Sequence, residues 1–143
     1  MELDPSVWGP HYWFVLNTIV LHYPKSPNKS IKKKYYNLIQ NVPLFLPNMN
    51  IKKKFNDLLN EFPVSPYLDT RESFTRWIHF IHNKINKSMG KNEIPLSCFL
   101  NNYYKNYKPK STIIKEEIKK RKKFIYLGIT ILILGVIYYL KDK

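Results

Sequence analysis

The stretch DPSVWGPHYWFVLNTIVL, residues 4–21, determines how the rest of the chain is interpreted. Asp4 and Pro5 form an N-cap and first-turn pair, which is typical of a helix start. Pro24 and Pro27 follow and cannot continue a helix. The apolar side chains between these limits recur at helical spacing: Val7, Trp8, Tyr12, Val15, Leu16 and Ile19. The stretch therefore predicts a helix that ends before Pro24.

Four further helical segments follow this first one. Ser30 is expected to cap the second helix, and Asn48 the third. Thr70 begins the longest amphipathic segment, which ends near Gly90, and a short last helix fits residues 95–104. No internal repeat and no long alternating strand pattern is evident. The segment before residue 107 is thus predicted to be an all-α bundle of about five helices with short connections.

The C-terminal segment FIYLGITILILGVIYYL, residues 124–140, contains no charged residue. Its 17 residues would rise about 25 Å as a helix, which is the short end of what crosses a bilayer core of about 30 Å. Tyrosines lie near both ends, as at membrane interfaces. The segment predicts a single transmembrane helix rather than a buried core helix.

The charges beside this segment predict its orientation. Five basic residues, 119–123, precede it, whereas Lys141 and Lys143 with Asp142 follow it. The positive-inside rule then places the N-terminal domain on the cytosolic side. The expected organisation is a helical domain over residues 1–107, a basic linker over 108–123, the transmembrane helix over 124–140 and a tail over 141–143.

Composition excludes several classes of protein. The 143 residues carry a formal net charge of +14, yet 44% are hydrophobic, which is too many for a disordered chain. A single cysteine, Cys98, excludes an intrachain disulfide scaffold and a cysteine-based zinc finger, and no metal site is expected. Neither glycine-rich phosphate-binding motif occurs. A basic run beside an apolar span favours a topological signal over nucleic-acid binding.

Two motifs resemble a known family. Residues 8–16, WGPHYWFVL, resemble the WGxxxWxxLH opening of the FAD-linked sulfhydryl oxidases, the Erv/ALR family. Residues 77–86, WIHFIHNKIN, resemble that family's WxxxxHNxVN signature, and Gly90-Lys91 follows where the family commonly has Gly-Lys. The resemblance covers roughly residues 5–107, in order along the chain.

The resemblance implies a fold, a cofactor and a partner. The family has a four-helix bundle plus a short fifth helix that holds FAD non-covalently, and its protomers usually pair. His82 and Asn86 are four residues apart and so share one helical face, and Lys91 could neutralise a pyrophosphate. The implied FAD-binding residues are Trp8, Gly9, Trp13, Asn17 in place of the family's usual His, His82, Asn83, Asn86 and Lys91.

The chain departs from the family at its reactive residues. Family members oxidise thiols with a CxxC pair beside the flavin, but alignment on Pro47 and Phe55 places Asn48 and Ile51 at these two positions. Neither side chain can be a thiolate, so no catalytic residue is assigned. Cys98 follows more than forty residues later, and one thiol cannot form an intramolecular disulfide.

Three functional hypotheses therefore stand. The chain is a redox-degenerate, membrane-anchored family member that keeps a FAD-binding or assembly role as a homodimer or a heterodimer with a paralogue. Alternatively, it is an active oxidase of a thiol protein substrate that uses thiols from a partner chain. The third hypothesis is a cofactor-free structural virion membrane protein. Such compact, anchored family members point to a large DNA virus, and thus to the host cytoplasm or the virion membrane.

Overall fold

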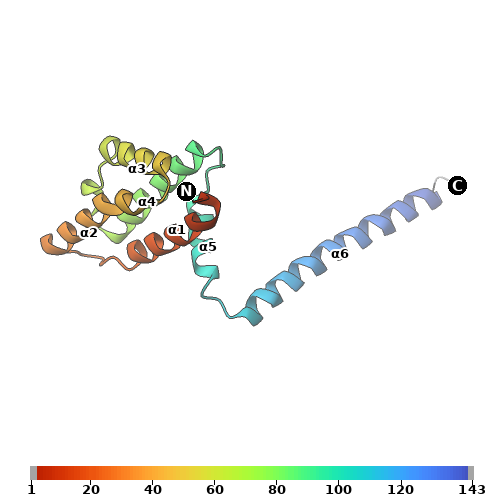
Figure 1. Ribbon diagram of the computed structural model, residues 1–143. Helices are drawn as coiled ribbons and strands as arrows, with labels where there is room; N and C mark the ends of the chain where they lie inside the picture. Colours follow the sequence, from red (N-terminus) through yellow and green to blue (C-terminus); the bar gives the residue numbers. More distant parts are fainter. Residues whose placement is uncertain (1–2, 142–143) are drawn as a thin grey trace. The chain divides into compact units, whose positions relative to one another are not determined.

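The computed structural model describes residues 3–141, which are helical with short connections and contain no strand. The chain divides into two compact units, Met1–Tyr103 and Tyr104–Lys143. Six α-helices follow one another (Figure 1), with short 3₁₀ helices at Val42–Phe45 and Ser65–Tyr67. Their bounds are α1 Pro5–Leu21, α2 Lys29–Asn41, α3 Met49–Glu61, α4 Arg71–Ser88, α5 Leu96–Lys105 and α6 Lys110–Lys141. The predicted all-α class, with a four-helix bundle, a short fifth helix and a C-terminal apolar helix, is confirmed.

Capping side chains determine where the helices begin. Asp4 Oδ1 accepts a hydrogen bond from the Ser6 N–H at 2.8 Å, and Asn48 Oδ1 accepts one from the Ile51 N–H at 3.0 Å. Thr70 forms a reciprocal capping box at the start of α4. The caps at Asp4 and Asn48, and the helix start at Thr70, were predicted correctly. The predicted cap of α2 was wrong, because Asn28 rather than Ser30 caps that helix.

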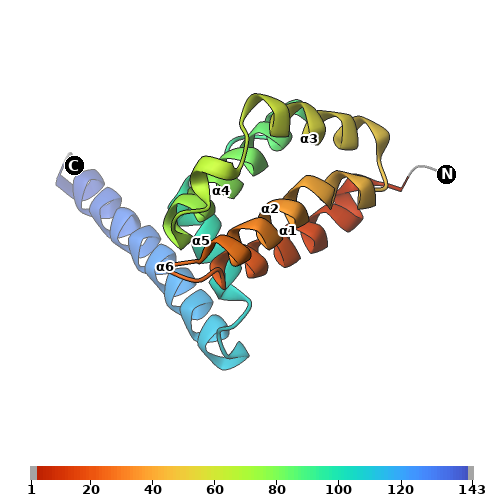
Figure 2. The same ribbon diagram turned by 90° about the vertical axis from the view of Figure 1, so that its left-hand side faces the viewer.

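The core of the first unit lies where α1 and α3 pack against α4 (Figure 2). Its largest fully buried side chains include Trp77, Tyr23, Phe55 and Phe74. Their polar atoms are paired: the Trp77 Nε1–H donates to the Phe62 carbonyl at 3.0 Å, and the Tyr23 hydroxyl donates to the Leu68 carbonyl at 2.8 Å. Buried aromatic side chains with paired polar atoms hold the helices in one arrangement.

The second unit contains α6, which includes both the basic and the apolar segments in one continuous helix. By length and composition, α6 is the one helix among the described residues that could cross a membrane. Its clearly polar Thr130 donates its hydroxyl hydrogen to the Tyr126 carbonyl at 2.9 Å, which removes the cost of an unpaired hydroxyl in lipid. Of the expected tail, Lys141 ends α6, whereas residues 142–143 lie outside the described residues.

Candidate functional site

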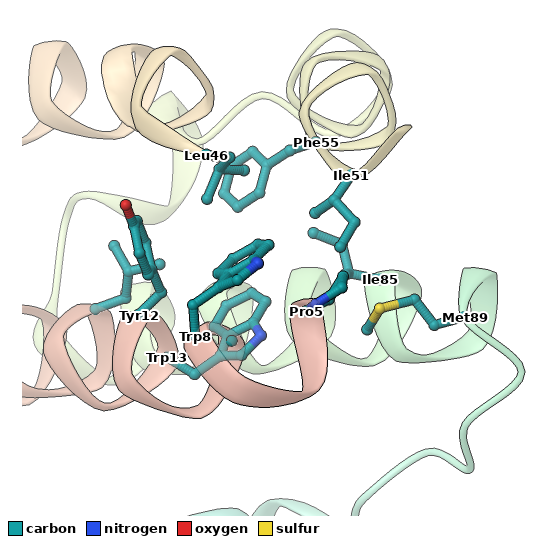
Figure 3. Close-up of a pocket in the computed structure, with 11 residues that line it drawn as sticks. Pro5, Trp8, Tyr12, Trp13, Leu46, Ile51, Phe55, Ile85 and Met89 are labelled. Carbon is teal, nitrogen blue, oxygen red and sulfur yellow. The ribbon is translucent and has the colours of Figure 1, made fainter. Parts of the chain in front are cut away.

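Both tryptophans of α1 face a small cavity between α1, α3 and α4 (Figure 3). Its volume is about 30 Å³, which is room for about two water molecules. Trp8, Gly9 and Trp13, which were predicted as site residues, line it. The remaining lining residues are Pro5, Tyr12, Leu16, Leu46, Ile51, Phe55, Ile85 and Met89. The walls are therefore almost entirely apolar or aromatic.

Trp13 connects this cavity to the second predicted motif. Its ring stacks on the imidazole of His82, with ring centroids 3.9 Å apart and planes 17° from parallel. It also stacks with Phe55 of α3 at 6.5 Å. The structure thus brings together Trp13 and His82, which are distant in the sequence and were predicted separately from the two motifs.

The position of His82 changes its ionisation. The pKa of the His82 imidazole is lowered from 6.5 to about 4, chiefly because the ring is buried and also because His79 and Lys91 lie nearby. The ring is therefore neutral at physiological pH. A neutral imidazole can stack and accept a hydrogen bond, but it does not neutralise an anion.

Asn17 lies one helical turn beyond Trp13 and is 8% exposed. Its Oδ1 atom is buried and has no hydrogen-bond partner among the described residues. An unsatisfied buried acceptor costs about 1–3 kcal/mol, so such atoms are uncommon in folded proteins. Asn17 is therefore the one predicted site residue with a free buried acceptor, suited to an N–H or O–H donor.

Asn83 was predicted to contact a cofactor, but its amide is engaged within the fold. Its Oδ1 accepts from the Ile94 N–H at 2.9 Å, and its Nδ2 donates to the Ile94 carbonyl at 3.0 Å. The His79 Nε2–H donates to the same carbonyl at 2.6 Å. These bonds attach the segment before α5 to α4. Asn86, also predicted, is buried one turn later on α4.

We expect Asn83→Ala to lower the free energy of unfolding by about 2 kcal/mol, because the Ile94 N–H loses its acceptor. Denaturant titration of the full chain in detergent micelles, followed by tryptophan fluorescence, measures this change, since all three tryptophans lie in the first unit. Asn56→Ala, at an exposed position on α3, is the control and should change stability by less than about 0.5 kcal/mol. Equal effects of the two variants would contradict the structural role of Asn83.

Lys91 follows the end of α4 in a turn that Gly90 makes possible. Gly90 has a φ of 70°, a conformation that favours glycine. The Lys91 N–H donates to the Asn86 carbonyl at 2.9 Å, and the Gly90 N–H donates to the Lys87 carbonyl at 3.1 Å, which together form a Schellman motif. Hydrogen bonds from Ser6 chiefly lower the pKa of Asp4, and burial chiefly lowers that of His82. The Lys91 charge also contributes in the same direction to both, so it acts on the start of α1 and on the Trp13–His82 stack.

The two positions that the resemblance assigns to the family's cysteine pair lie at the start of α3. Asn48 is the N-cap and its side chain binds the Ile51 N–H, while the Ile51 side chain lines the cavity (Figure 3). Cys98 lies exposed on α5 and is not among the lining residues. The cavity therefore presents an alkyl group, rather than a thiol, at position 51.

The start of α3 resembles the start of α2, with six of twelve residues identical, and the sequence analysis missed this similarity. Residues 28–39 read NKSIKKKYYNLI and residues 48–59 read NMNIKKKFNDLL. In each segment the asparagine caps the helix by accepting from the N–H of the isoleucine three residues later, at 2.9 Å for Ile31 and 3.0 Å for Ile51. Position 48 thus has the ordinary form of a structural helix start.

The chemistry of these residues suits the FAD that the resemblance implies, although the cavity is small. Aromatic rings can stack on a flavin or an adenine, the buried Asn17 Oδ1 lacks a donor, and Lys91 supplies a cation. A cavity of about 30 Å³ is well below the several hundred Å³ of ligand pockets. The side chains that line it must therefore move before a ring system enters.

Sequence reasoning missed three residues that shape this site. Phe55 stacks with Trp13, the Tyr12 hydroxyl donates to the Phe45 carbonyl at 2.8 Å, and His79 binds Ile94. The sequence analysis included Tyr12 only in the apolar pattern of the first helix and used Phe55 only to align the family's motif. Within residues 3–141, no group of three or more His, Cys, Asp or Glu side chains could hold a metal ion.

Comparison with known families and proteins agrees with the two motifs. The model of the Erv1 / Alr family matches residues 10–108. A mimivirus protein named "Probable FAD-linked sulfhydryl oxidase R368" is 28% identical over 62% of this chain and 63% of its own length. The FAD-linked sulfhydryl oxidase of African swine fever virus is 28% identical over 67% of this chain and 79% of its own length. The chain thus spans just under two thirds of the mimivirus protein.

Solved structures show the same fold. The FAD-binding domain of Erv1 from Saccharomyces cerevisiae superposes with a TM-score of 0.65 and 23% identity, over 75% of this chain and 99% of that domain. The yeast Erv1 core gives a TM-score of 0.64 and 22% identity, over 72% of this chain and 86% of its own. At this level of identity the likeness concerns the fold alone.

Proposed function

Because the chain belongs to the Erv1 / Alr family, we propose that it is a membrane-anchored flavin-binding member that does not oxidise thiols by itself. The observation that carries the proposal is the start of α3, where Asn48 caps the helix and Ile51 lines the cavity, at the two positions that the resemblance assigns to the family's cysteine pair. The Asn48 amide, which caps the helix, and the Ile51 alkyl side chain cannot accept electrons from a thiol. The remaining role is FAD binding or assembly with other proteins.

In this proposal the first unit holds FAD through residues of α1 and α4. When bound, FAD supplies electron-accepting chemistry. Trp8, Gly9 and Trp13 supply an apolar wall, Asn17 Oδ1 supplies a hydrogen-bond acceptor, and the neutral His82 stacks beside them. Lys91 supplies the cation for the pyrophosphate. Asn83 and Asn86 act indirectly, by holding the end of α4 and the segment that follows it.

The absorbance spectrum of the full chain, purified in a mild detergent with FAD and then freed of excess FAD, tests the proposal. We expect bound flavin, and with a dithiol substrate we expect no oxygen uptake beyond that of free FAD. A chain that retains no flavin would favour a cofactor-free structural protein. Turnover with flavin bound, persisting in Cys98→Ser, would favour an oxidase that draws thiols from another chain.

We expect Lys91→Gln to weaken FAD binding about tenfold, because a charge-assisted contact to phosphate contributes about 1.5 kcal/mol or more. Titration of the apo chain with FAD, followed by quenching of flavin fluorescence, measures the affinity. Lys87→Gln removes the same charge from an exposed position one turn earlier on α4 and should leave the affinity unchanged. An unchanged affinity in Lys91→Gln would remove Lys91 from the site.

The proposed domain organisation follows the charge and length of each segment. Residues 1–107 form the family domain, 108–123 lead into the membrane, 124–140 cross it and 141–143 form the tail. Five basic residues on the N-terminal side favour a cytosolic first unit. The viral relatives support a viral source, and thus a place at the virion membrane or in the host cytoplasm. Alkaline extraction and protease protection of membranes that contain the full chain test the anchor and the orientation.

Pairing with a second copy or a paralogue is proposed for the outer face of α1 and α2, which lie side by side (Figure 2). Unlike its neighbours, α1 is apolar around its whole circumference, and a helix of this kind is normally covered on all sides. A groove of about 400 Å³ lies between the two helices. Val15 and Leu38, which line it, are 55% and 41% exposed, although Leu58, the α3 counterpart of Leu38, is 1% exposed.

We expect Val15→Glu with Leu38→Glu to convert the chain from dimer to monomer, because two buried carboxylates on each side would face an apolar partner surface. Analytical ultracentrifugation of the full chain in detergent measures the mass, and circular dichroism should show unchanged helix content. Tyr67→Glu, at an exposed position on another face, should leave the dimer intact. A wild-type monomer would contradict the proposed pairing.

A further inference from the structure

Five consecutive basic residues of α6 lie immediately before its apolar part, and their side chains extend around the helix. These residues, Lys119, Lys120, Arg121, Lys122 and Lys123, are called the basic collar below; all are exposed and helical. Successive residues of an α-helix are about 100° apart, so five of them extend beyond one full turn. The continuous helix therefore directs positive charge to every side at one level along its axis.

No collar residue forms an ion pair within the described chain, although the charge of Lys120 is felt by Glu116. Two acidic residues, Glu116 and Glu117, lie nearby, but Glu116 accepts hydrogen bonds from Lys108 Nζ at 2.9 and 3.2 Å. This bond lowers the pKa of the Glu116 carboxyl. Among residues 3–141, no carboxylate lies within 4.0 Å of a collar nitrogen. The collar is therefore available to an external anion.

The length of the apolar segment sets the level of the collar in a membrane. Residues 124–140 rise about 25 Å, less than a bilayer core of about 30 Å. A short span keeps its flanking residues at the boundary, where long basic side chains extend toward the headgroups. Tyr126, in the first turn of the apolar part, suits the same interface.

We propose that the basic collar binds anionic phospholipid headgroups in the leaflet that faces the first unit. This inference rests on the membrane anchoring that is part of the proposed function. Lysine and arginine side chains attract the phosphate and carboxylate groups of such headgroups electrostatically. This attraction weakens as salt screens the charges. Nucleic-acid phosphates offer a similar charge, but continuity with an apolar helix places the collar beside lipid.

The test measures which lipids surround the full chain in phosphatidylcholine vesicles, using spin-labelled phosphatidylserine and phosphatidylcholine and electron paramagnetic resonance. We expect phosphatidylserine to be preferred at least about fivefold at low salt, which is what one basic residue contributes at an anionic surface, with a smaller preference at high salt. Substitution of all five collar residues by glutamine should abolish the preference. The matched control replaces five exposed basic residues of the first unit by glutamine and should retain it: Lys25, Lys29, Lys33, Lys34 and Lys53.

The possible failures can be distinguished. If the chain resists alkaline extraction from the vesicles but shows no lipid preference, the anchoring stands and the collar proposal is overturned. If the chain is extracted, the anchoring itself is wrong, and the collar proposal fails with it. If the collar substitutions abolish binding of a labelled RNA oligonucleotide and leave lipid association unchanged, the collar is a nucleic-acid site and the proposal is overturned.

Discussion

Cysteines placed at both positions 48 and 51 are expected to give the chain dithiol oxidase activity well above that of free FAD. Position 48 is the N-cap of α3, where the helix dipole and free N–H groups favour a thiolate and lower its pKa. Position 51 lines the cavity beside Trp8 and Phe55. The double variant Asn48→Cys with Ile51→Cys therefore restores a cysteine pair in the place where the resemblance puts it, and oxygen uptake with a dithiol substrate measures the result.

The internal similarity of α2 and α3 supplies a matched control for this experiment. Asn28→Cys with Ile31→Cys creates the same CxxC spacing, on the same helix cap, in a helix whose isoleucine is not among the residues that line the cavity. Each double variant loses one asparagine cap, at a cost of about 1 kcal/mol. We expect activity from the α3 pair alone. A flavin-loaded α3 variant with three titratable thiols, Cys98 included, and no turnover would show that the site has lost more than its cysteines.

Local chemistry explains why most of the fold could be predicted. The caps at Asp4, Asn48 and Thr70 are side-chain-to-backbone bonds over two or three residues, so sequence alone contains both partners. The predicted N-cap of α2 was wrong because Asn28 and Ser30, two residues apart, are both good capping residues. The Asn28 side chain reaches the Ile31 N–H, so the helix begins at Lys29.

The candidate site could be predicted only in part, because its geometry depends on contacts between distant elements. The two motifs identified Trp13 and His82, but not that their rings stack. Asn83 was assigned to a cofactor, although its amide binds the backbone of Ile94, eleven residues later. His79 was given no role of its own within the second motif, yet it binds that same residue. No periodicity or spacing contains such pairings.

His82 is expected to make the first unit less stable as the pH falls from about 6.5 to about 4. The folded-state pKa of His82 is about 4, chiefly because the ring is buried, whereas the unfolded chain has the ordinary value of 6.5. Between these values the unfolded chain binds a proton that the folded chain does not. The stabilisation is therefore fully present above pH 6.5 and decreases by about 1.4 kcal/mol per pH unit below it, so that the loss amounts to about 3 kcal/mol near pH 4.

Denaturant titration across this pH range, followed by tryptophan fluorescence, measures the loss in the full chain without flavin. His82→Phe keeps an aromatic ring against Trp13 but cannot be protonated. Over the same pH range, the variant should therefore lose about 3 kcal/mol less stability than the wild type. His22→Gln removes an exposed histidine from the end of α1 and should keep the wild-type slope. Because burial against Trp13 is what disfavours the charged imidazole, an unaltered slope in His82→Phe would mean that the His82 ring is solvated in the folded chain.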